Sequence, residues 1–384
     1  MKSLVILGAS GSIGSQTLDI LAKNSEEFVL LGFSVGEQTR IIPSLIKKYS
    51  SIEAICIKDE KKAQALRKKY PDIKFFSSDE GLTDLIDETN PDMVVNALVG
   101  FVGLKPTLHS LNKNIDVALA NKEALVVGGE LVNKVLAKGK GRIYPIDSEH
   151  SALWKCLKVD NENVTRLIIT ASGGAFRKLP RQELFNVTPE QALAHPTWNM
   201  GAKITIDCAT MVNKSFEIIE AYYLFGYKYE QIHVLLHDES MIHSMVLYED
   251  GFYRAEINKP DMRNPIRFAL FEGKYPFETY VSDDFHKFGP YHFHDFDIDR
   301  FPMVRYAKTV IDKKGSYGAC YNASNEVAVH AFLNKEIPFL AIETIINKCM
   351  EHHAYIKEVN YEILAEVDAK TRQFARDLIE KGEF

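Results

Sequence analysis

Two side chains in the second half of the chain have the types and the spacing to bind a phosphorylated, metal-bound substrate. Lys214 and Glu217 are three residues apart in a predicted helix, so both lie on one face of it. Asn213 and small polar residues stand where this helix should begin, and the N–H groups of a helix N-terminus bind phosphate well. The lysine favours an anion and the carboxylate favours a cation. The same spacing also suits an ordinary surface ion pair, and these residues alone leave both interpretations open.

A second acidic pair follows a predicted strand at residues 142–146. Asp147 and Glu149 are separated only by Ser148, so both carboxylates lie on the same side if the chain is still extended. Two carboxylates this close repel each other unless they share a cation or a proton. Oxygen ligands of this kind suit Mg²⁺ or Mn²⁺ rather than zinc. The alternative is that Asp147 and Ser148 cap the helix predicted at 152–157 and Glu149 supplies a first-turn charge.

The elements that must position these residues begin with a glycine-rich turn near the N-terminus. A buried strand at residues 3–9 runs into Gly8, Gly11 and Gly14, and a helical pattern follows at once. This context is typical of a dinucleotide-binding site, where glycine lets the backbone approach a pyrophosphate. The next strand, at 28–34, does not end in an acidic residue, which favours NADP over NAD. Arg40 could meet a 2′-phosphate, whereas Glu37 would oppose it.

Strands and helices then alternate through the first half of the chain. The expected strands lie near 53–57, 73–76, 92–96, 115–119 and 142–146. This alternation predicts an α/β fold with an N-terminal, Rossmann-like, doubly wound parallel sheet. Ligands of such sheets bind beyond the carboxyl ends of the strands. We therefore expect ligand-binding residues after two of these strands. They are Asn121, Lys122 and Glu123 after the strand near 115–119, and Asp147, Ser148 and Glu149 after the strand near 142–146.

The pattern changes after residue 147 to a central α+β region. A strand at 166–171 ends in Ser172 and two glycines, a common tight turn that could also present N–H groups to a ligand. A loop at 195–201 carries Trp198 and is predicted to be a flap, although a lone Trp is more often tucked into a core. The further expected elements are a short β-rich segment at 203–207, a helix at 211–225, and an antiparallel sheet near 232–236, 243–248 and 252–257 with one open face suited to dimerisation.

Four segments are predicted from these patterns. They are a dinucleotide-binding domain at 1–147, a catalytic and dimerisation domain at 148–258, a linker at 259–301, and a C-terminal helical domain at 302–384. Residues 322–326, with the sequence NASNE, resemble a helix start. His292 and His294 have metal-like spacing but no acidic or cysteine partner completes a recognisable set, so they are interpreted as structural or surface residues.

Composition excludes several classes of protein. The net charge of −6 argues against a nucleic-acid or membrane-surface binder, which would present a basic face. The five cysteines are scattered without a CxxC motif, which suits a reducing cytoplasm. No apolar stretch is long enough to cross a membrane. The sequence therefore predicts a cytoplasmic enzyme or binding protein for a small anionic molecule.

Seven blocks of the sequence together resemble the 1-deoxy-D-xylulose 5-phosphate reductoisomerase family. They are GASGSIG, ANKEALV, IDSEH, ITASGGAFR, HPTWNMGAKITIDCATMVNK, FEIIEA and YNASNEVAV, in this order. The resemblance implies a homodimer that uses NADPH and Mg²⁺ or Mn²⁺ to convert a sugar phosphate, 1-deoxy-D-xylulose 5-phosphate, into 2-C-methyl-D-erythritol 4-phosphate for isoprenoid synthesis. It also implies inhibition by fosmidomycin. The alternatives are another NAD(P)-dependent dehydrogenase of a phosphorylated small molecule and a non-catalytic dinucleotide sensor.

The resemblance also implies a role for each site residue. Asp147, Glu149 and Glu217 would hold the metal, and Lys122 and Ser148 would contact the substrate beside it. The phosphate would be bound by Ser172, Asn213 and Lys214, enclosed by His195, and contacted by Cys208, a position at which the family usually has serine. The cofactor site would be lined by Ser10, Gly11, Ser12, Ile13, Gly36, Gln38, Asn121, Glu123 and Gly201. Gln38 is a second departure, because this position is usually asparagine.

Overall fold

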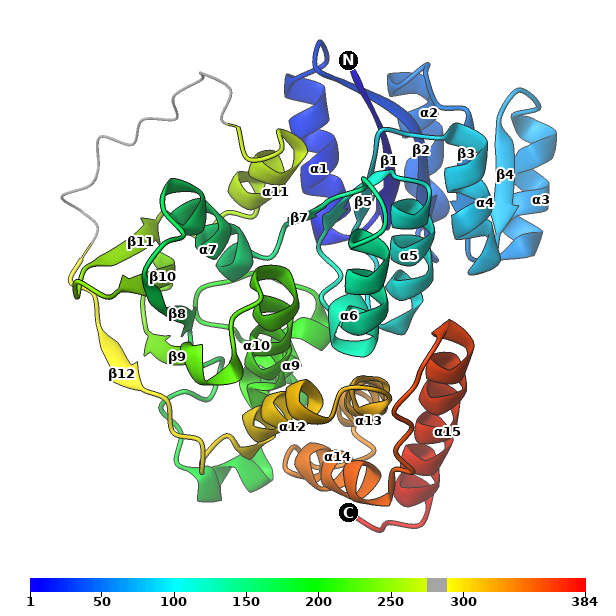
Figure 1. Ribbon diagram of the computed structural model, residues 1–384. Helices are drawn as coiled ribbons and strands as arrows, with labels where there is room; N and C mark the ends of the chain where they lie inside the picture. The colour runs from blue at the N-terminus through cyan, green and yellow to red at the C-terminus, as the bar shows by residue number, and fades with distance from the viewer. Residues whose placement is uncertain (275–288) are drawn as a thin grey trace. The chain divides into compact units, whose positions relative to one another are not determined.

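The first apolar run of the chain forms the central strand of a seven-stranded parallel sheet. In the computed structural model, which describes residues 1–274 and 289–384, β1 (Lys2–Leu7) pairs with β2 (Phe28–Val35) on one side and β5 (Met93–Asn96) on the other (Figure 1). The sheet order is β4-β3-β2-β1-β5-β6-β7, which confirms the doubly wound parallel arrangement. The remaining strands are β3 (Ala54–Ile57), β4 (Lys74–Ser77), β6 (Asp116–Leu119) and β7 (Ile143–Pro145).

Helices connect these parallel strands, as right-handed crossovers require. They are α1 (Ser12–Lys23), α2 (Ile42–Lys48), α3 (Glu60–Lys69), α4 (Glu80–Thr89), α5 (Leu104–Asn112) and α6 (Glu123–Leu136), with short 3-10 turns η1 (Thr39–Ile41) and η2 (Phe101–Gly103). Strand residues at the centre of the sheet are fully buried, including Leu4 to Leu7 of β1. This apolar core supports the glycine-rich turn that follows β1.

That turn is too tight for side chains at two of its three glycines. Gly8 has a φ of +86°, and a Cβ there would lie 2.6 Å from the carbonyl oxygen of Ala97. A Cβ on Gly14 would lie 2.3 Å from the carbonyl oxygen of Gly8. Gly11, by contrast, is exposed and would meet only Gly8 O, at 3.4 Å. Gly8 and Gly14 therefore pack the turn against the sheet, and Gly11 keeps the N-terminus of α1 open.

The second sheet has five strands in the order β11-β10-β8-β9-β12. They are β8 (Val164–Ala171), β9 (Ile232–His237), β10 (Ile242–Tyr248), β11 (Tyr253–Ile257) and β12 (Phe293–Asp295). Four of these were expected, but the sheet is mixed rather than antiparallel throughout, because β8 and β9 are parallel. The reason is the long helical connection between them, which brings the chain back in the same direction.

The helices before β8 and between β8 and β9 correct one expectation. They are α7 (Ser148–Val159), which precedes β8, then η3 (Arg181–Asn186), α8 (Pro189–Ala192), α9 (Ala202–Thr210), α10 (Val212–Phe225) and η4 (Tyr229–Gln231). Residues 203–207, predicted to be β-rich, lie in α9. The β-branched residues there favour a strand locally, but Lys203 and Asp207 form an i,i+4 ion pair of 2.9 Å that suits a helix. Met211, at a φ of +63°, separates α9 from α10.

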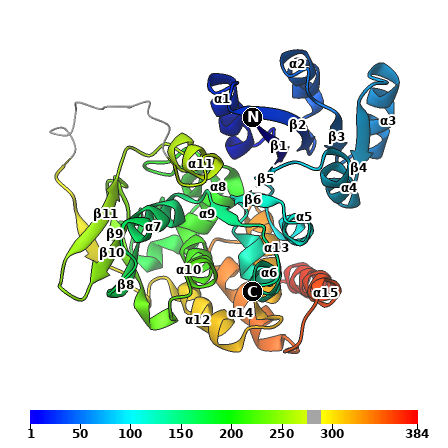
Figure 2. The same cartoon turned by 45° about the horizontal axis from the view of Figure 1, so that its top comes forward.

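The C-terminal region is helical, as expected. It contains η6 (Pro302–Val304), α12 (Arg305–Lys313), α13 (Tyr317–Leu333), α14 (Ala341–His352) and α15 (Tyr361–Glu380), which gather side by side in both views (Figures 1 and 2). The predicted helix start at 322–326 is wrong, because these residues lie in the middle of α13. Asn325 is fully buried there, and its Nδ2 donates to Asp207 Oδ1 at 2.8 Å and so ties α13 to α9.

The predicted linker at 259–301 contains one helix that sequence periodicity missed. α11 (Arg263–Leu270) packs against α1, and Arg263 Nη2 lies 2.8 Å from Asp19 Oδ2. Nearby, Phe271 meets Phe28 edge-on with ring centres 4.9 Å apart. The helix is only eight residues long, too short to show a clear period in the sequence. Residues 275–288 of the predicted linker lie outside the described residues.

The chain divides into two compact units. One comprises Met1–Ala124, Leu131–Asp147 and the segment that begins at Met262, and the other comprises Leu125–Glu130, Ser148–Asp261 and the described residues from 289 onward. The four-segment division made from the sequence stays a prediction. Within the part of the chain that the structure describes, no helix is both long and apolar enough to cross a membrane.

The glycine turn generates a stability prediction. Gly14→Ala should lower the free energy of unfolding by roughly 1–3 kcal/mol, because overpacking against Gly8 O outweighs the gain of at most about 1 kcal/mol in helix propensity. Gly11→Ala, whose Cβ has room, is the matched control and should leave stability nearly unchanged. Urea denaturation of both variants measures the difference. Equal midpoints for the two variants would contradict the close packing assigned to Gly14.

Candidate active site

The turn after β8 brings Ser172 against helix α9. Gly173 and Gly174 have φ values of +78° and +67°, which favour glycine. A Cβ on Gly174 would lie 2.6 Å from the carbonyl oxygen of Cys208, so the turn can approach the end of α9 only because this residue has no side chain. The backbone N–H of Gly174 donates to Ser172 Oγ at 3.2 Å. Ser172 and Cys208, predicted from distant blocks, are therefore held on two segments in close contact.

His195 fastens the predicted flap to this turn. Its Nδ1 accepts hydrogen bonds from the backbone N–H groups of Thr197 and Trp198, at 3.2 and 3.0 Å, so the neutral ring carries its proton on Nε2. Nε2 lies 2.9 Å from Ser172 Oγ and donates to it. Burial, aided by the positive charge of Arg177, lowers the pKa of His195 to about 4. The imidazole is therefore neutral at physiological pH, and the hydroxyl proton of Ser172 is available to another acceptor.

Trp198 is half-buried rather than exposed. Its ring centre lies 6.0 Å from that of His243 on β10. The loop at 195–201 thus makes contacts at both His195 and Trp198. That this loop is a flap stays a prediction.

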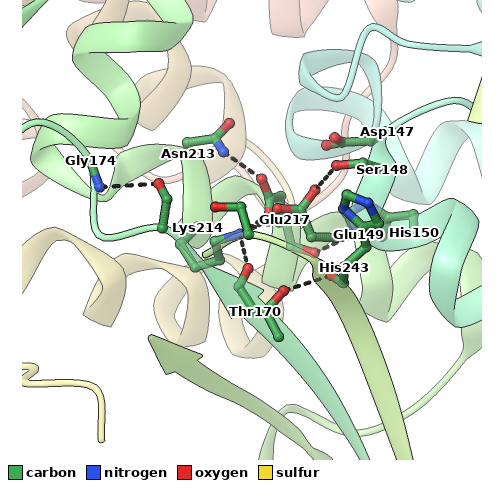
Figure 3. A network of polar contacts seen from close by, with 12 residues as sticks. Asp147, Ser148, Glu149, His150, Thr170, Gly174, Asn213, Lys214, Glu217 and His243 are labelled. Carbon is green, nitrogen blue, oxygen red and sulfur yellow. Dashed lines mark hydrogen bonds and ion pairs between the residues drawn. The ribbon is translucent and has the colours of Figure 1, made fainter. Parts of the chain in front are cut away.

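A buried lysine joins two carboxylates beneath the turn. Lys214 Nζ lies 2.9 Å from Glu149 Oε1, donates to the carbonyl oxygen of Thr170 at 2.7 Å, and contacts Glu217 Oε2 (Figure 3). The side chains of Lys214 and Glu217 are 4% and 1% exposed. Burial alone would lower the pKa of Lys214, but the charges of Glu149 and Glu217 outweigh it and raise this pKa. Asn213 Nδ2 donates to the other oxygen of Glu217.

The surface ion pair considered from the sequence is therefore a buried cluster built from three elements. Glu149 comes from α7, Thr170 from β8, and Lys214 and Glu217 from α10. Buried charges are retained only when they are paired and hydrogen-bonded. The packing of these elements thus depends on the cluster.

The acidic residues of the IDSEH block meet this cluster at the start of α7. The helix begins at Ser148, whose Oγ donates to Glu149 Oε2 at 2.5 Å. Asp147 immediately precedes the helix, and its Oδ2 lies 2.5 Å from Lys122 Nζ. Asp147, Glu149 and Glu217 each offer an oxygen, and these oxygens lie within 4.8 Å of one another. A helix start and an acidic cluster, treated as alternatives in the sequence, coexist here.

A second group of possible metal ligands shares Asp147 with the first group. Asp147, His150 and Glu220 also offer atoms within 4.8 Å of one another. His150 Nε2 donates to the carbonyl oxygen of Glu217 at 2.8 Å, and its Nδ1 lies 3.2 Å from Glu220 Oε2. The fully buried His150 thus joins α7 to α10. Sequence reasoning missed this role, although the histidine directly follows Glu149.

The predicted cofactor residues of the first unit gather at the carboxyl ends of β1 and β2. Gly11 is the N-cap of α1, and no side chain caps this helix, so its N–H groups are open to a ligand. Gly36 and Gln38 follow β2 and are exposed. The backbone N–H of Ala9 donates to Ser34 O at 2.8 Å, which holds the two strand ends together. The residues placed at this edge are Ser10, Gly11, Ser12, Ile13, Gly36 and Gln38.

Asn121 and Gly201 have different surroundings. Asn121 Nδ2 donates to the carbonyl oxygens of Leu98 and Gly100, at 3.2 and 3.0 Å, and to Glu123 Oε2 at 3.1 Å. Asn121 thus shapes the loop after β5. Gly201 belongs to the second unit, where it is the N-cap of α9 with open space around it.

The two surface histidines have acidic partners that the sequence did not reveal. His292 Nδ1 lies 2.5 Å from Glu239 Oε1, and His294 Nε2 lies 3.8 Å from Asp238 Oδ1. Both histidine side chains are more than half exposed. Their interpretation as structural or surface residues agrees with these contacts, which fasten β12 beside β9.

The fold and the site define a class of protein: an oxidoreductase-type dinucleotide-binding α/β unit joined to a second unit that carries a buried lysine–carboxylate cluster. Comparison with protein families narrows this class. The family model for 1-deoxy-D-xylulose 5-phosphate reductoisomerase matches residues 4–129, that for its C-terminal domain matches 143–225, and that for the DXP reductoisomerase C-terminal domain matches 257–374. The chain belongs to the 1-deoxy-D-xylulose 5-phosphate reductoisomerase family.

Relatives and solved structures agree over the whole chain. The reductoisomerase 2 of Bacillus thuringiensis subsp. konkukian (strain 97-27) is 44% identical over 384 residues, covering 99% of this chain and all of the relative. The enzyme from Zymomonas mobilis in complex with NADPH has a TM-score of 0.89 at 35% identity and 99% coverage of both chains. A DOX-P reductoisomerase in complex with NADPH, fosmidomycin and magnesium has a TM-score of 0.92 at 32% identity, covering 99% of this chain and 98% of that one.

The depressed pKa of His195 generates a prediction about pH. Because the folded value of about 4 lies below the ordinary 6.5, the unfolded chain binds more protons between these two values. Folding stability should therefore fall as the pH drops from 6.5 towards 4. In His195→Asn, whose side-chain oxygen can still accept from the flap N–H groups, the fall should be smaller over this window. Urea midpoints measured at several pH values test this, and identical pH profiles for the two proteins would contradict a neutral, buried His195.

Proposed function

We infer that the chain is an NADPH- and divalent-metal-dependent reductoisomerase that converts 1-deoxy-D-xylulose 5-phosphate into 2-C-methyl-D-erythritol 4-phosphate. The observation that carries this inference is the full-length membership of the family, with 44% identity to a curated member. The cluster of Glu149, Lys214 and Glu217 in a buried position supports it, because a metal-dependent site needs acidic ligands whose geometry is held by the fold.

The acidic residues suit the proposed metal. We propose that Asp147, Glu149 and Glu217 hold it, since each offers a hard carboxylate oxygen and the three oxygens lie close enough to share one ion. The all-carboxylate set fits magnesium better than the set that contains His150, whose two nitrogens already bind Glu217 O and Glu220. When bound, a divalent cation polarises the substrate carbonyl and stabilises developing negative charge. Manganese would fit the same ligands.

Lys122 and Ser148 are proposed to orient the substrate beside these ligands. The Lys122 ammonium pairs with Asp147, and the Ser148 hydroxyl pairs with Glu149, so both donors contact carboxylates of the proposed ligand set. Either donor can be shared with a substrate hydroxyl at the cost of one existing contact. Their pairing in this structure keeps both side chains in place before substrate arrives, which lowers the cost of ordering them.

The turn after β8 is proposed to bind the substrate phosphate. Ser172 has a hydroxyl proton to donate, because the neutral His195 already fills one of its acceptor positions. Asn213 and Lys214 lie at the start of α10, and Cys208 lies across the turn. Phosphate contacts lie away from the reacting carbons, so their binding energy can be used to order the His195 loop over the substrate and exclude water.

The open N-terminus of α1 is proposed to bind the pyrophosphate of NADPH. Ser10 to Ile13 supply this contact, Gly36 and Gln38 flank the adenosine ribose, and Asn121 and Glu123 shape the loop beside the cofactor. Gly201, the N-cap of α9, is proposed as a further cofactor residue from the family resemblance. When bound, NADPH supplies the hydride that reduces the aldehyde formed by rearrangement of the carbon skeleton.

We further propose a homodimer in a reducing cytoplasm that serves isoprenoid synthesis and is inhibited by fosmidomycin-type compounds. Support for the dimer comes from the edge strand β11, which ends a sheet and presents exposed Phe252, Tyr253 and Ile257. Support for the compartment comes from the five cysteines, none of which forms a disulfide within the described residues.

Removal of the metal or of one ligand should stop the reaction. The assay follows NADPH consumption with 1-deoxy-D-xylulose 5-phosphate and Mg²⁺. Excess EDTA and the variant Glu217→Gln should each reduce turnover by at least about a hundredfold. Removing a residue that only hydrogen-bonds to a metal ligand already costs up to about a hundredfold. Circular dichroism should show that the variant keeps its fold. Glu220→Gln is the matched control from the alternative ligand set. Full activity in Glu217→Gln, with loss in Glu220→Gln, would transfer the metal to that set.

Cys208 should make phosphate binding weaker than a serine would, since a thiol is the poorer donor. Cys208→Ser should lower KM for the substrate by about two- to tenfold, the range of one neutral hydrogen bond, with kcat little changed. Cys156→Ser, on α7 and away from the turn, is the control and should leave KM unaltered. Steady-state kinetics measures both. An unchanged KM in Cys208→Ser would remove residue 208 from the phosphate site.

A further inference from the structure

A cationic corner lies where β2 and β3 end in the first unit. The two strands are parallel neighbours, with Val35 beside Ile57, so the residues that follow them share one edge of the sheet. Glu37 follows β2, and Lys62 lies in the first turn of α3, which follows β3. Glu37 Oε2 lies 3.2 Å from Lys62 Nζ. In dinucleotide-binding folds, the residue beyond the second strand meets the 2′ position of the adenosine ribose.

Glu37 would ordinarily favour NADH over NADPH. An acidic side chain at this position accepts hydrogen bonds from a ribose 2′-hydroxyl and repels a 2′-phosphate. Here the carboxylate is paired with an ammonium, so its charge is offset at the point where a 2′-phosphate would arrive. The repulsion expected from Glu37 is therefore weaker than the sequence indicates.

The other acidic residues near Lys62 are engaged elsewhere. Asp59 caps α3 and accepts from the backbone N–H of Lys62 at 3.0 Å, which fixes the turn that carries the lysine. Glu60 Oε1 lies 3.1 Å from Arg67 Nη1, and its other oxygen accepts from Ser77. Arg40, in η1, is exposed and adds a second positive charge on the β2 side. The charge of Glu60 is thus offset by Arg67, and that of Glu37 by Lys62.

We propose that Lys62 is the residue that recognises the 2′-phosphate of NADPH in this chain. The side chains of Lys62 and Glu37 are 41% and 73% exposed, so the ammonium is accessible to a phosphate while Lys62 stays in its turn of helix. A lysine is a suitable point-charge ligand for phosphate. Glu37 then acts as the anchor of the lysine rather than as a ligand of the ribose. This inference rests on the proposed use of NADPH and names the residue that selects it.

The test is direct binding of two nucleotides that differ only at the 2′ position. Adenosine 2′,5′-bisphosphate and adenosine 5′-monophosphate are titrated into the full chain by calorimetry. Lys62→Met should weaken binding of the bisphosphate about tenfold, the value of one charge-assisted hydrogen bond, and leave the monophosphate within about twofold. Glu37→Gln removes the negative charge beside Lys62, so this variant should bind the bisphosphate at least as tightly as the wild type.

Lys61→Met is the matched control, because this lysine is the exposed neighbour on the same helix turn. It should leave both affinities unchanged, and thermal denaturation should be unaltered in all variants, since an exposed ion pair contributes little to stability. The assignment to Lys62 would be overturned if Lys62→Met still preferred the bisphosphate. It would also be overturned if Lys61→Met lost the preference equally, or if only Arg40→Met lost it. A wild type without any preference for the bisphosphate would overturn the proposed NADPH use as well.

Discussion

The buried carboxylate of Glu217 beside the partly buried carboxylate of Glu149 is the constraint on which the second unit depends. Glu149 and Glu217 come from different helices, and the buried Glu217 could not remain charged so close to Glu149 without a cation beside them. Lys214 supplies that cation here and also binds the carbonyl oxygen of Thr170, so one ammonium links α7, α10 and β8. A divalent ion at the same oxygens would compete with this ammonium. The lysine therefore supports this part of the site, and a divalent ion at the proposed ligands would have to displace it.

The proposed phosphate site rests on a contact between uncharged groups instead. Its central contact is between a hydroxyl and a neutral imidazole, Ser172 and His195, and the depressed pKa of His195 keeps that ring uncharged. A neutral ring can hold the loop at 195–201 in place whether or not an anion is present. Positive charge for a phosphate then comes from Lys214 alone among the proposed phosphate residues. Release of Lys214 from the carboxylates would thus couple the two halves of the site through a single side chain.

Local sequence patterns predicted those features that depend on residues close together in the chain. Strand alternation predicted the parallel sheet, the spacing of Gly8, Gly11 and Gly14 predicted the turn, and acidic residues after a strand predicted the cluster at Asp147 and Glu149. The features that the sequence did not predict depend on contacts between residues distant in the chain. Residues 203–207 are helical because α9 packs on α13, and Asn325 in the interior of α13 donates to Asp207 of α9. The pairing of Glu37 with Lys62 joins residues that are distant in sequence, so no motif reveals it.

Competition between Lys214 and the metal can be measured directly. Magnesium is titrated by calorimetry into the wild type and into Lys214→Met, without substrate or cofactor. If the ammonium occupies the oxygens that bind the metal, removing it should tighten magnesium binding and make the thermal stability of the variant depend on magnesium more strongly than that of the wild type. Magnesium affinity that is unchanged or lower in Lys214→Met, with the fold intact, would contradict the account.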